Sequence, residues 1–130
     1  MRILIIEDDE ASRKLMGMLL SKYGECVFAE NGKMAYEKFK EDFKKNLRFD
    51  LLLLDIMMPE MDGQETLKHI KEFEKENGIW PNEGANVIMT TALGDPENIK
   101  EAFKSQCEGY LVKPIIKKDL VEEMIKIGIL

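Results

Sequence analysis

The sequence has few cysteines, which disulfide scaffolds and zinc knuckles need, and it has no long apolar run of the kind that spans a membrane. Its 130 residues include only two cysteines, Cys26 and Cys107, which fit neither a disulfide framework nor a metal site. No apolar run approaches the ~20 residues that span a bilayer, and the start of the chain does not resemble an export signal. We therefore predict two small buried thiols, a reducing compartment and a cytoplasmic protein with no membrane contact.

Basic residues are outnumbered by acidic ones, and histidine is scarce. The chain has 19 Lys and Arg against 25 Asp and Glu, which gives a formal net charge of −6 at pH 7. Binding to a phosphate backbone needs a concentrated basic surface, so we predict no direct contact with nucleic acid. The single histidine, His69, lies within a helical pattern and is predicted to be an ordinary side chain at the solvent edge, not a phosphate donor.

Short apolar runs alternate with helical patterns along the whole chain. Runs such as residues 2–6 and 51–54 are unbroken, which is typical of strands covered on both faces of a parallel sheet. Repeats such as Ala35, Phe39 and Phe43 mark amphipathic helices between them. Five such pairs predict an α/β fold: a (βα)₅ doubly wound, flavodoxin-like three-layer sandwich with strand order 2-1-3-4-5. We expect a single domain over residues 1–130.

The same patterns predict details of the helices and loops. A helix is expected to begin at Ala11, and another at Pro96 behind an Asp95 cap. The side chains expected to face inward in these two helices are Ala11, Leu15, Met18, Leu19, Ile99, Ala102 and Phe103. Residues 79–86 predict a long connecting loop, which is either a surface insertion pinned by Trp80 or a contact with a partner.

Acidic residues follow two of the predicted strands. Glu7 and Asp8 come after the first run and Asp55 ends the leucine run, so strand order 2-1-3-4-5 brings all three to the ligand crevice. At about 5 Å and an effective dielectric of about 20, each ionised pair repels by roughly 3 kcal/mol. Such a cluster takes up protons or binds a cation, and oxygen ligands favour Mg²⁺ (or Mn²⁺). The alternative is that the acids cap separate helices and never meet.

Two more strand ends carry polar side chains. Thr91 closes the fourth predicted strand and Lys113 the fifth, so a hydroxyl and an ammonium group are expected at the same edge. A carboxylate beside a divalent ion can attack a phosphoryl group, because the ion offsets repulsion between the two anions. Asp55, Thr91 and Lys113 therefore form a predicted phosphoryl-transfer site.

Four segments together resemble the receiver domain of two-component response regulators: residues 5–9 (IIEDD), 54–63 (LDIMMPEMDG), 90–92 (TTA) and 109–114 (GYLVKP). The resemblance covers essentially the whole chain. It implies that Asp55 accepts phosphate from a histidine kinase or a histidine phosphotransfer protein. It also implies that Mg²⁺ is coordinated by Glu7, Asp8, Asp55 and the backbone carbonyl of Met57.

The resemblance further implies how the site acts as a switch. Thr91 and Lys113 would contact the acyl phosphate, and Tyr110 would turn inward as Thr91 is drawn to it. The Lys113–Pro114 bond is usually cis in this family. We expect no output domain, so a downstream protein would bind the face made by the helix from Pro96, the strand 109–112 and the helix from about residue 117. The only catalysis expected is of the protein's own phosphorylation and dephosphorylation.

The sequence departs from the family pattern at three functional positions. Glu7 stands where Asp is common, and its extra methylene makes its role as a metal ligand less direct than that of Asp8. Met57 and Leu93, two residues beyond Asp55 and Thr91, are apolar at positions that influence the lifetime of the phosphate. Because neither side chain can position an attacking water, we predict slow self-hydrolysis.

Three other functions fit parts of the pattern. A phosphatase of the haloacid dehalogenase class also uses a strand-end Asp with Mg²⁺, but it needs a second acid where Met57 stands. A flavodoxin-like cofactor carrier needs a hydroxyl- and glycine-rich loop after the first strand, where this chain has acids. A degenerate receiver acting as a scaffold is a third alternative, against which the intact Asp55, Thr91 and Lys113 argue.

Overall fold

The structure is a computed structural model that describes residues 1–58, 61–92, 96–104 and 106–130, without the side chains of Asn98 and Ile99. The elements in chain order are β1 (Arg2–Ile6), α1 (Glu10–Leu20), β2 (Glu25–Ala29), α2 (Gly32–Lys44), β3 (Leu51–Asp55), α3 (Gly63–Glu76), β4 (Asn86–Thr91), α4 (Pro96–Lys104), β5 (Gly109–Val112) and α5 (Lys117–Lys126). The predicted Asp95 cap of α4 lies outside the described residues. No helix in the described ranges is both long and apolar enough to cross a membrane.

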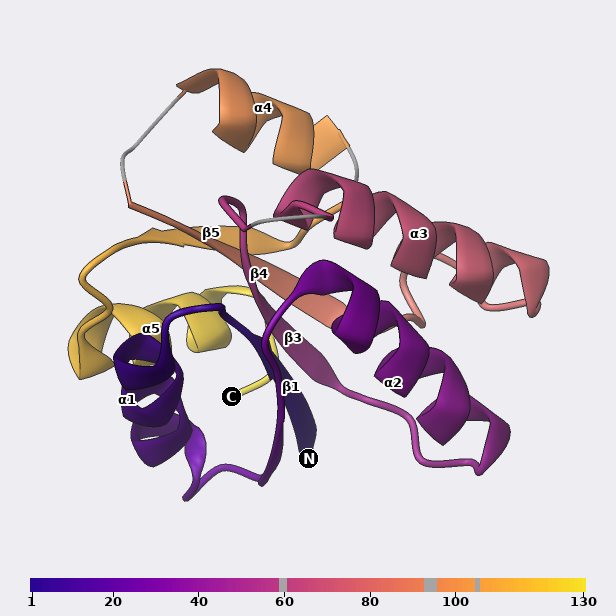
Figure 1. Ribbon diagram of the computed structural model, residues 1–130, viewed down its shortest axis with the longest axis horizontal. Helices are drawn as coiled ribbons and strands as arrows, with labels where there is room; N and C mark the ends of the chain where they lie inside the picture. Colours follow the sequence, from indigo (N-terminus) through magenta and orange to yellow (C-terminus); the bar gives the residue numbers. More distant parts are fainter. Residues whose placement is uncertain (59–60, 93–95, 105) are drawn as a thin grey trace.

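The five strands form one parallel sheet in the order β2-β1-β3-β4-β5, which confirms the predicted topology. Helices α1 and α5 lie on one side of the sheet, and α2, α3 and α4 lie on the other (Figure 1). Strand β3 is central and completely buried, because helices cover it on both faces. Its leucines alternate between the two cores, with Leu51 and Leu53 under α1 and α5 and Leu52 and Leu54 under α2 and α3.

The predicted inner face of α1 is wrong in part. Leu19 packs against the core as predicted, but Ala11, Leu15 and Met18 are exposed. Met16 and Leu20 are the buried side chains of this helix, whereas Leu15 and Met18 are 44% and 76% exposed. Apolar residues occupy two neighbouring stripes of α1, and periodicity alone does not say which stripe meets the sheet. The packing decides it: Gly17 lies under the ring of Phe28, at a place where a Cβ would be 2.7 Å from the ring.

The prediction for α4 is wrong in part. Ala102 is fully buried as expected, but Phe103 is 45% exposed. The Phe103 ring packs edge-on against Tyr110 of β5, with 5.9 Å between ring centroids. The helix therefore presents an aromatic side chain at the surface, next to the exposed edge of the sheet.

The two thiols differ in burial. Cys107 is buried, and desolvation raises its pKa to about 12, so it is an inert apolar side chain at neutral pH. Cys26 is only partly buried, and desolvation also raises its pKa. The prediction of two buried thiols is thus confirmed for Cys107 and wrong for Cys26, which lies near the start of the edge strand β2.

The α3–β4 connection is held by polar contacts and not by its tryptophan. The side chain of Trp80 is 70% exposed, so it does not pin the loop as predicted. Instead, the Glu74 carboxylate accepts a hydrogen bond from the backbone N–H of Ala85 at 2.8 Å. The Arg48 guanidinium donates to the carbonyl of Glu83 at 3.1 Å.

Candidate functional site

The acidic residues after β1 and at the end of β3 meet at one edge of the sheet. Strand β1 pairs directly with β3 in register, with Ile6 beside Leu54, so the next residues of the two strands are neighbours. Carboxylate oxygens of Glu7, Asp8 and Asp55 all lie within 4.8 Å of one another. The alternative of three separate caps is wrong, because α1 and α3 are capped by Asp9 and Asp62.

Two of the three carboxylates are buried. Glu7 is 0% and Asp55 3% exposed, whereas Asp8 is exposed at the rim. Desolvation, reinforced by the neighbouring Glu7 carboxyl group, raises the pKa of Asp8. Desolvation and the neighbouring carboxyl group therefore both oppose ionisation of Asp8.

Lys113 is the cation that enters this cluster. Its ammonium group donates a hydrogen bond to Asp55 Oδ2 at 3.2 Å and to the Glu7 carboxylate. Burial acts to lower the pKa of Lys113, but the hydrogen bond to Glu7 and the charges of Asp55 and Glu7 outweigh it and raise the pKa. The Lys113–Pro114 peptide bond is cis, as the family resemblance implied. A single ammonium group thus faces three carboxylates.

The turn after Asp55 depends on Gly63, the last residue of the segment 54–63 that carries the family resemblance. The N–H of Met57 donates to Asp55 Oδ1 at 3.2 Å, and the N–H of Gly63 donates to the carbonyl of Ile56 at 2.9 Å. A Cβ at Gly63 would lie 2.3 Å from the Asp55 carbonyl oxygen. Glycine is therefore required where α3 begins against the end of β3, and it sets the position of Asp55.

Thr91 and Tyr110 occupy different environments. Thr91 is buried at the end of β4, and its carbonyl accepts the N–H of Lys113 at 2.7 Å. Tyr110 is 36% exposed on β5. The exposed side chain of Met57 lies in the turn beside the acidic cluster, and Leu93 lies outside the described residues. His69 is on α3, stacked on Tyr36 with 5.3 Å between ring centroids.

Thr90 was not predicted as a site residue. It pairs with Asp55 in the register of β3 and β4, it is 1% exposed, and its hydroxyl oxygen has no hydrogen-bond partner in the described part of the chain. The doubled threonine at residues 90–91 is the only sequence signal for it. A buried hydroxyl therefore lies directly beside the strand position of Asp55.

The donor set of the cluster fits a hard divalent cation. It offers carboxylate oxygens from Glu7, Asp8 and Asp55, and oxygen-only ligation suits Mg²⁺ or Mn²⁺ better than zinc or copper. Neighbouring donors hold two of the three carboxylates in place. Asp55 accepts from Lys113 and the N–H of Met57, and Glu7 accepts from Lys113 and, at 3.3 Å, from the N–H of Asp9. The site therefore combines a cation-binding group, a buried carboxylate and an ammonium group at one sheet edge.

Comparison with known proteins gives a consistent set of relatives. A family model described as the response regulator receiver domain matches residues 3–125. The chain is 35% identical over 122 residues to the chemotaxis protein CheY of Halobacterium salinarum, covering 93% of this chain and 91% of that protein. It is 33% identical over 129 residues to the CheY of Thermotoga maritima, covering 98% and 97%.

Solved structures of other proteins have the same fold as this chain. A structure of the CheX-CheY-BeF3-Mg+2 complex from Borrelia burgdorferi includes a chain that is 27% identical to this one, with a TM-score of 0.82 and coverage of 97% of this chain and 87% of that chain. A receiver domain protein from Clostridium thermocellum is also 27% identical, with a TM-score of 0.79.

Proposed function

The chain belongs to the response regulator receiver domain family, and we propose that it is a phosphoryl-accepting signalling switch of a two-component system or phosphorelay. Asp55 takes a phosphoryl group from a phosphohistidine of a histidine kinase or a histidine phosphotransfer protein. The observation that carries this proposal is the meeting of Glu7, Asp8 and Asp55 within 4.8 Å, with Lys113 reaching the same point. We also propose that residues 1–130 act as a single receiver domain.

The acidic cluster would hold Mg²⁺ (or Mn²⁺) through Asp8, Asp55, Glu7 and the backbone carbonyl of Met57. When bound, the divalent ion supplies positive charge that offsets repulsion between a carboxylate and an incoming phosphoryl group. Asp8 is a more direct ligand than Glu7, because Glu7 already shares its carboxylate with Lys113 and the N–H of Asp9. The presence of Mg²⁺ in the complex of the Borrelia relative supports the assignment.

Phosphoryl transfer needs a nucleophile and donors for the phosphoryl oxygens. A carboxylate oxygen of Asp55 forms a bond to phosphorus while the bond from phosphorus to the donor's imidazole nitrogen breaks, and that electron pair stays on the nitrogen. The ammonium group of Lys113 lies 3.2 Å from Asp55 Oδ2, so a small movement brings it to a phosphoryl oxygen. The hydroxyl of Thr91 is the second donor. We propose no catalysis beyond this self-phosphorylation and its reversal by hydrolysis.

The signal would leave through the face made by α4, β5 and α5. Movement of Thr91 toward the phosphate opens space into which Tyr110 turns, and the surrounding surface changes with it. The apolar side chains exposed on this face support a protein partner: Phe103, Tyr110, Val112 and Ile116 are between 36% and 50% exposed. The pairing of CheX with the Borrelia relative supports the same kind of output. We propose no direct nucleic-acid partner.

Incubation with acetyl phosphate tests the proposal. We expect the intact mass of the wild-type protein to rise by one phosphoryl group when Mg²⁺ is present and not in EDTA, and we expect no gain for Asp55→Asn. Asp50→Asn makes the same change just before the first residue of β3, where Asp50 is exposed, and it should be phosphorylated like the wild type. A wild-type protein that never gains the group would favour the scaffold alternative, and turnover of a generic phosphomonoester would favour the phosphatase.

The lifetime of the phosphate gives a separate prediction. Met57 is 67% exposed beside the cluster and cannot position a water. We expect Met57→Asn to speed loss of the phosphoryl group by roughly tenfold, less than a full general base supplies because an amide orients water without taking its proton. Decay of the protein-bound phosphate after removal of the donor measures the rate. Met57→Leu is the control and should decay like the wild type; equal rates for Met57→Asn would contradict the explanation.

The coupling through Thr91 is also testable. We expect phosphorylation of the wild type to shift the backbone amide NMR signals of Phe103, Tyr110 and Val112. In Thr91→Ala these shifts should be lost, while signals next to Asp55 still respond. Thr91→Ser keeps a hydroxyl group and should preserve the distant shifts. Undiminished shifts in phosphorylated Thr91→Ala would show that the signal takes another route.

A further inference from the structure

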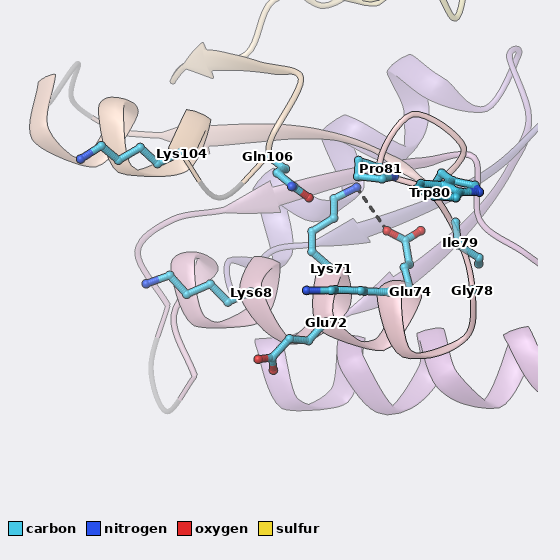
Figure 2. Close-up of a pocket in the computed structure, with 11 residues that line it drawn as sticks. Lys68, Lys71, Glu72, Glu74, Gly78, Ile79, Trp80, Pro81, Lys104 and Gln106 are labelled. Carbon is cyan, nitrogen blue, oxygen red and sulfur yellow. Dashed lines mark ion pairs between the residues drawn. The ribbon is translucent and has the colours of Figure 1, made fainter.

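A large groove lies away from the acidic cluster. It is formed by the C-terminal half of α3, the α3–β4 connection and the C-terminal end of α4 together with Gln106, and its volume is about 740 Å³. Figure 2 shows the side chains that line it. It shares no residue with the carboxylate cluster, nor with Tyr110 and Val112 of the proposed partner face. Its size falls in the range of natural ligand sites, so it calls for its own explanation.

The floor of the groove is a buried ion pair whose polar groups are already satisfied. Lys71 and Glu74 are 3.2 Å apart, with side chains 9% and 4% exposed. Glu74 accepts the N–H of Ala85 at 2.8 Å, and Lys71 donates to the carbonyl of the same residue at 2.9 Å. Gly84 makes this possible, because a Cβ there would lie 2.5 Å from the Glu74 oxygens. The floor is therefore fixed by the fold and needs no ligand to stabilise it.

The rim of the groove is apolar at one end and basic at the other. Trp80, with Ile79 and Pro81 beside it, lies at one end, and Lys68 and Lys104 lie toward the other (Figure 2). Trp80 is 70% exposed. An exposed tryptophan at the edge of a groove is the type of side chain that dominates binding energy in protein interfaces.

The two rim lysines are available to a ligand. Lys104 forms no ion pair within the described ranges of the chain. Lys68 pairs with Glu101 at 3.1 Å, but both side chains are at least half exposed. Such a surface pair contributes little and is easily exchanged for another carboxylate. The rim thus offers positive charge on a protein whose overall charge is −6.

We propose that this groove docks an acidic peptide segment of a protein partner, with an apolar side chain of the peptide against Trp80 and its carboxylates on Lys68 and Lys104. A peptide is favoured over a nucleic acid because one end of the groove is apolar and Glu72 lies among its lysines, so the groove is not the concentrated basic surface that a phosphate backbone needs. Glu72 and Gln106 can also bond to the N–H and C=O groups of a peptide. This docking is independent of phosphate acceptance by Asp55.

A defined peptide tests the proposal, and the single tryptophan of the chain reports on the site. The probe is a short fluorescein-labelled peptide in which Glu alternates with Leu and Phe. We expect it to raise fluorescence anisotropy on binding, and its unlabelled form to shift the emission of Trp80 to shorter wavelength. Lys68→Glu with Lys104→Glu should weaken binding by roughly tenfold or more, through loss of two charge contacts and the repulsion that replaces them. Trp80→Ala should weaken it as well.

Matched controls separate the groove from general charge effects. Lys14→Glu makes the same charge change at an exposed position on α1, across the sheet from the groove (Figure 1), and should leave binding unchanged. A peptide with Lys in place of Glu should not bind, and Asp55→Asn should bind like the wild type even if phosphorylation fails. The proposal is overturned if the Lys68 and Lys104 changes have no more effect than Lys14→Glu. An unmoved Trp80 emission, or tighter binding of a single-stranded oligonucleotide, would equally overturn it.

Discussion

Asp55→Asn will be more stable than the wild type when divalent cations are absent, by about 2 kcal/mol. Asp55 lies within 4.8 Å of two other carboxylates and 3.2 Å from one ammonium group. Each repulsion is worth roughly 3 kcal/mol at an effective dielectric of about 20, and the attraction to Lys113 roughly 5 kcal/mol, so the sum of the pair terms opposes folding. Burial of the Asp55 carboxylate adds a desolvation cost to the same side.

Urea unfolding in EDTA and in Mg²⁺ measures this difference. We expect Mg²⁺ to stabilise the wild type by more than it stabilises Asp55→Asn, because a ligand that binds the folded state shifts the equilibrium toward it. Glu41→Gln removes one exposed negative charge from α2 and should behave like the wild type in both conditions. An Asp55→Asn protein that is less stable than the wild type in EDTA would show that Lys113 alone neutralises the cluster.

Asp42→Ala will destabilise the protein by about 3 kcal/mol, because it leaves a largely buried guanidinium with only the exposed carboxylate of Glu25 as its ion-pair partner. Arg2 pairs with Asp42 at 2.9 Å, and their side chains are 17% and 3% exposed. Arg2 also donates to the carbonyl of Leu47 at 2.8 Å, and its guanidinium lies 4.4 Å from the centre of the Phe49 ring. These contacts tie β1 to α2 and to the segment before β3, at the edge of the sheet opposite the carboxylate cluster.

An exposed ion-pair partner of Asp42 provides the control. Lys38 reaches Asp42 from the solvent side at 3.2 Å, with 40% of its side chain exposed, so Lys38→Ala should cost less than about 1 kcal/mol. The urea unfolding midpoints of the two variants, each compared with that of the wild type, measure the two losses of stability. Equal losses for Lys38→Ala and Asp42→Ala would show that burial of the Arg2–Asp42 pair does not set the size of the effect.

The same pair predicts a pH dependence. Desolvation acts to raise the pKa of Asp42, but the hydrogen bonds from Arg2 and Lys38 outweigh it and hold the pKa below its ordinary value of 3.8. A carboxyl group whose pKa is lowered by folding contributes stability above its ordinary pKa, and this contribution is lost as the pH falls through the lowered value. The difference between wild type and Asp42→Ala should therefore be full near neutral pH and narrow below about pH 4.

Much of the site followed from strand ends. An unbroken apolar run such as residues 51–54 is typical of a strand covered on both faces, and parallel strands deliver their next residues to one edge. The strand ends therefore correctly predicted that Asp55 meets Glu7 and Asp8 and that Lys113 lies near them. They did not predict the roles of Gly63 and Thr90, because a tight approach of two backbones and an unpaired hydroxyl depend on atoms that meet only after folding.

Local sequence determined the positions of the strands and the residues that end them, since periodicity and chain direction are properties of neighbours in the chain. The order of the sheet followed from the topology that five alternating strands and helices favour. Which stripe of α1 faces the sheet, why Phe103 lies outside, and how Arg2 finds Asp42 were decided by packing between segments far apart in sequence. Packing between distant segments also forms the groove beside Trp80, because its walls come from α3, the loop after it and the end of α4. Contacts between distant segments leave no periodic pattern in a single sequence, and only the tertiary structure brings the residues together.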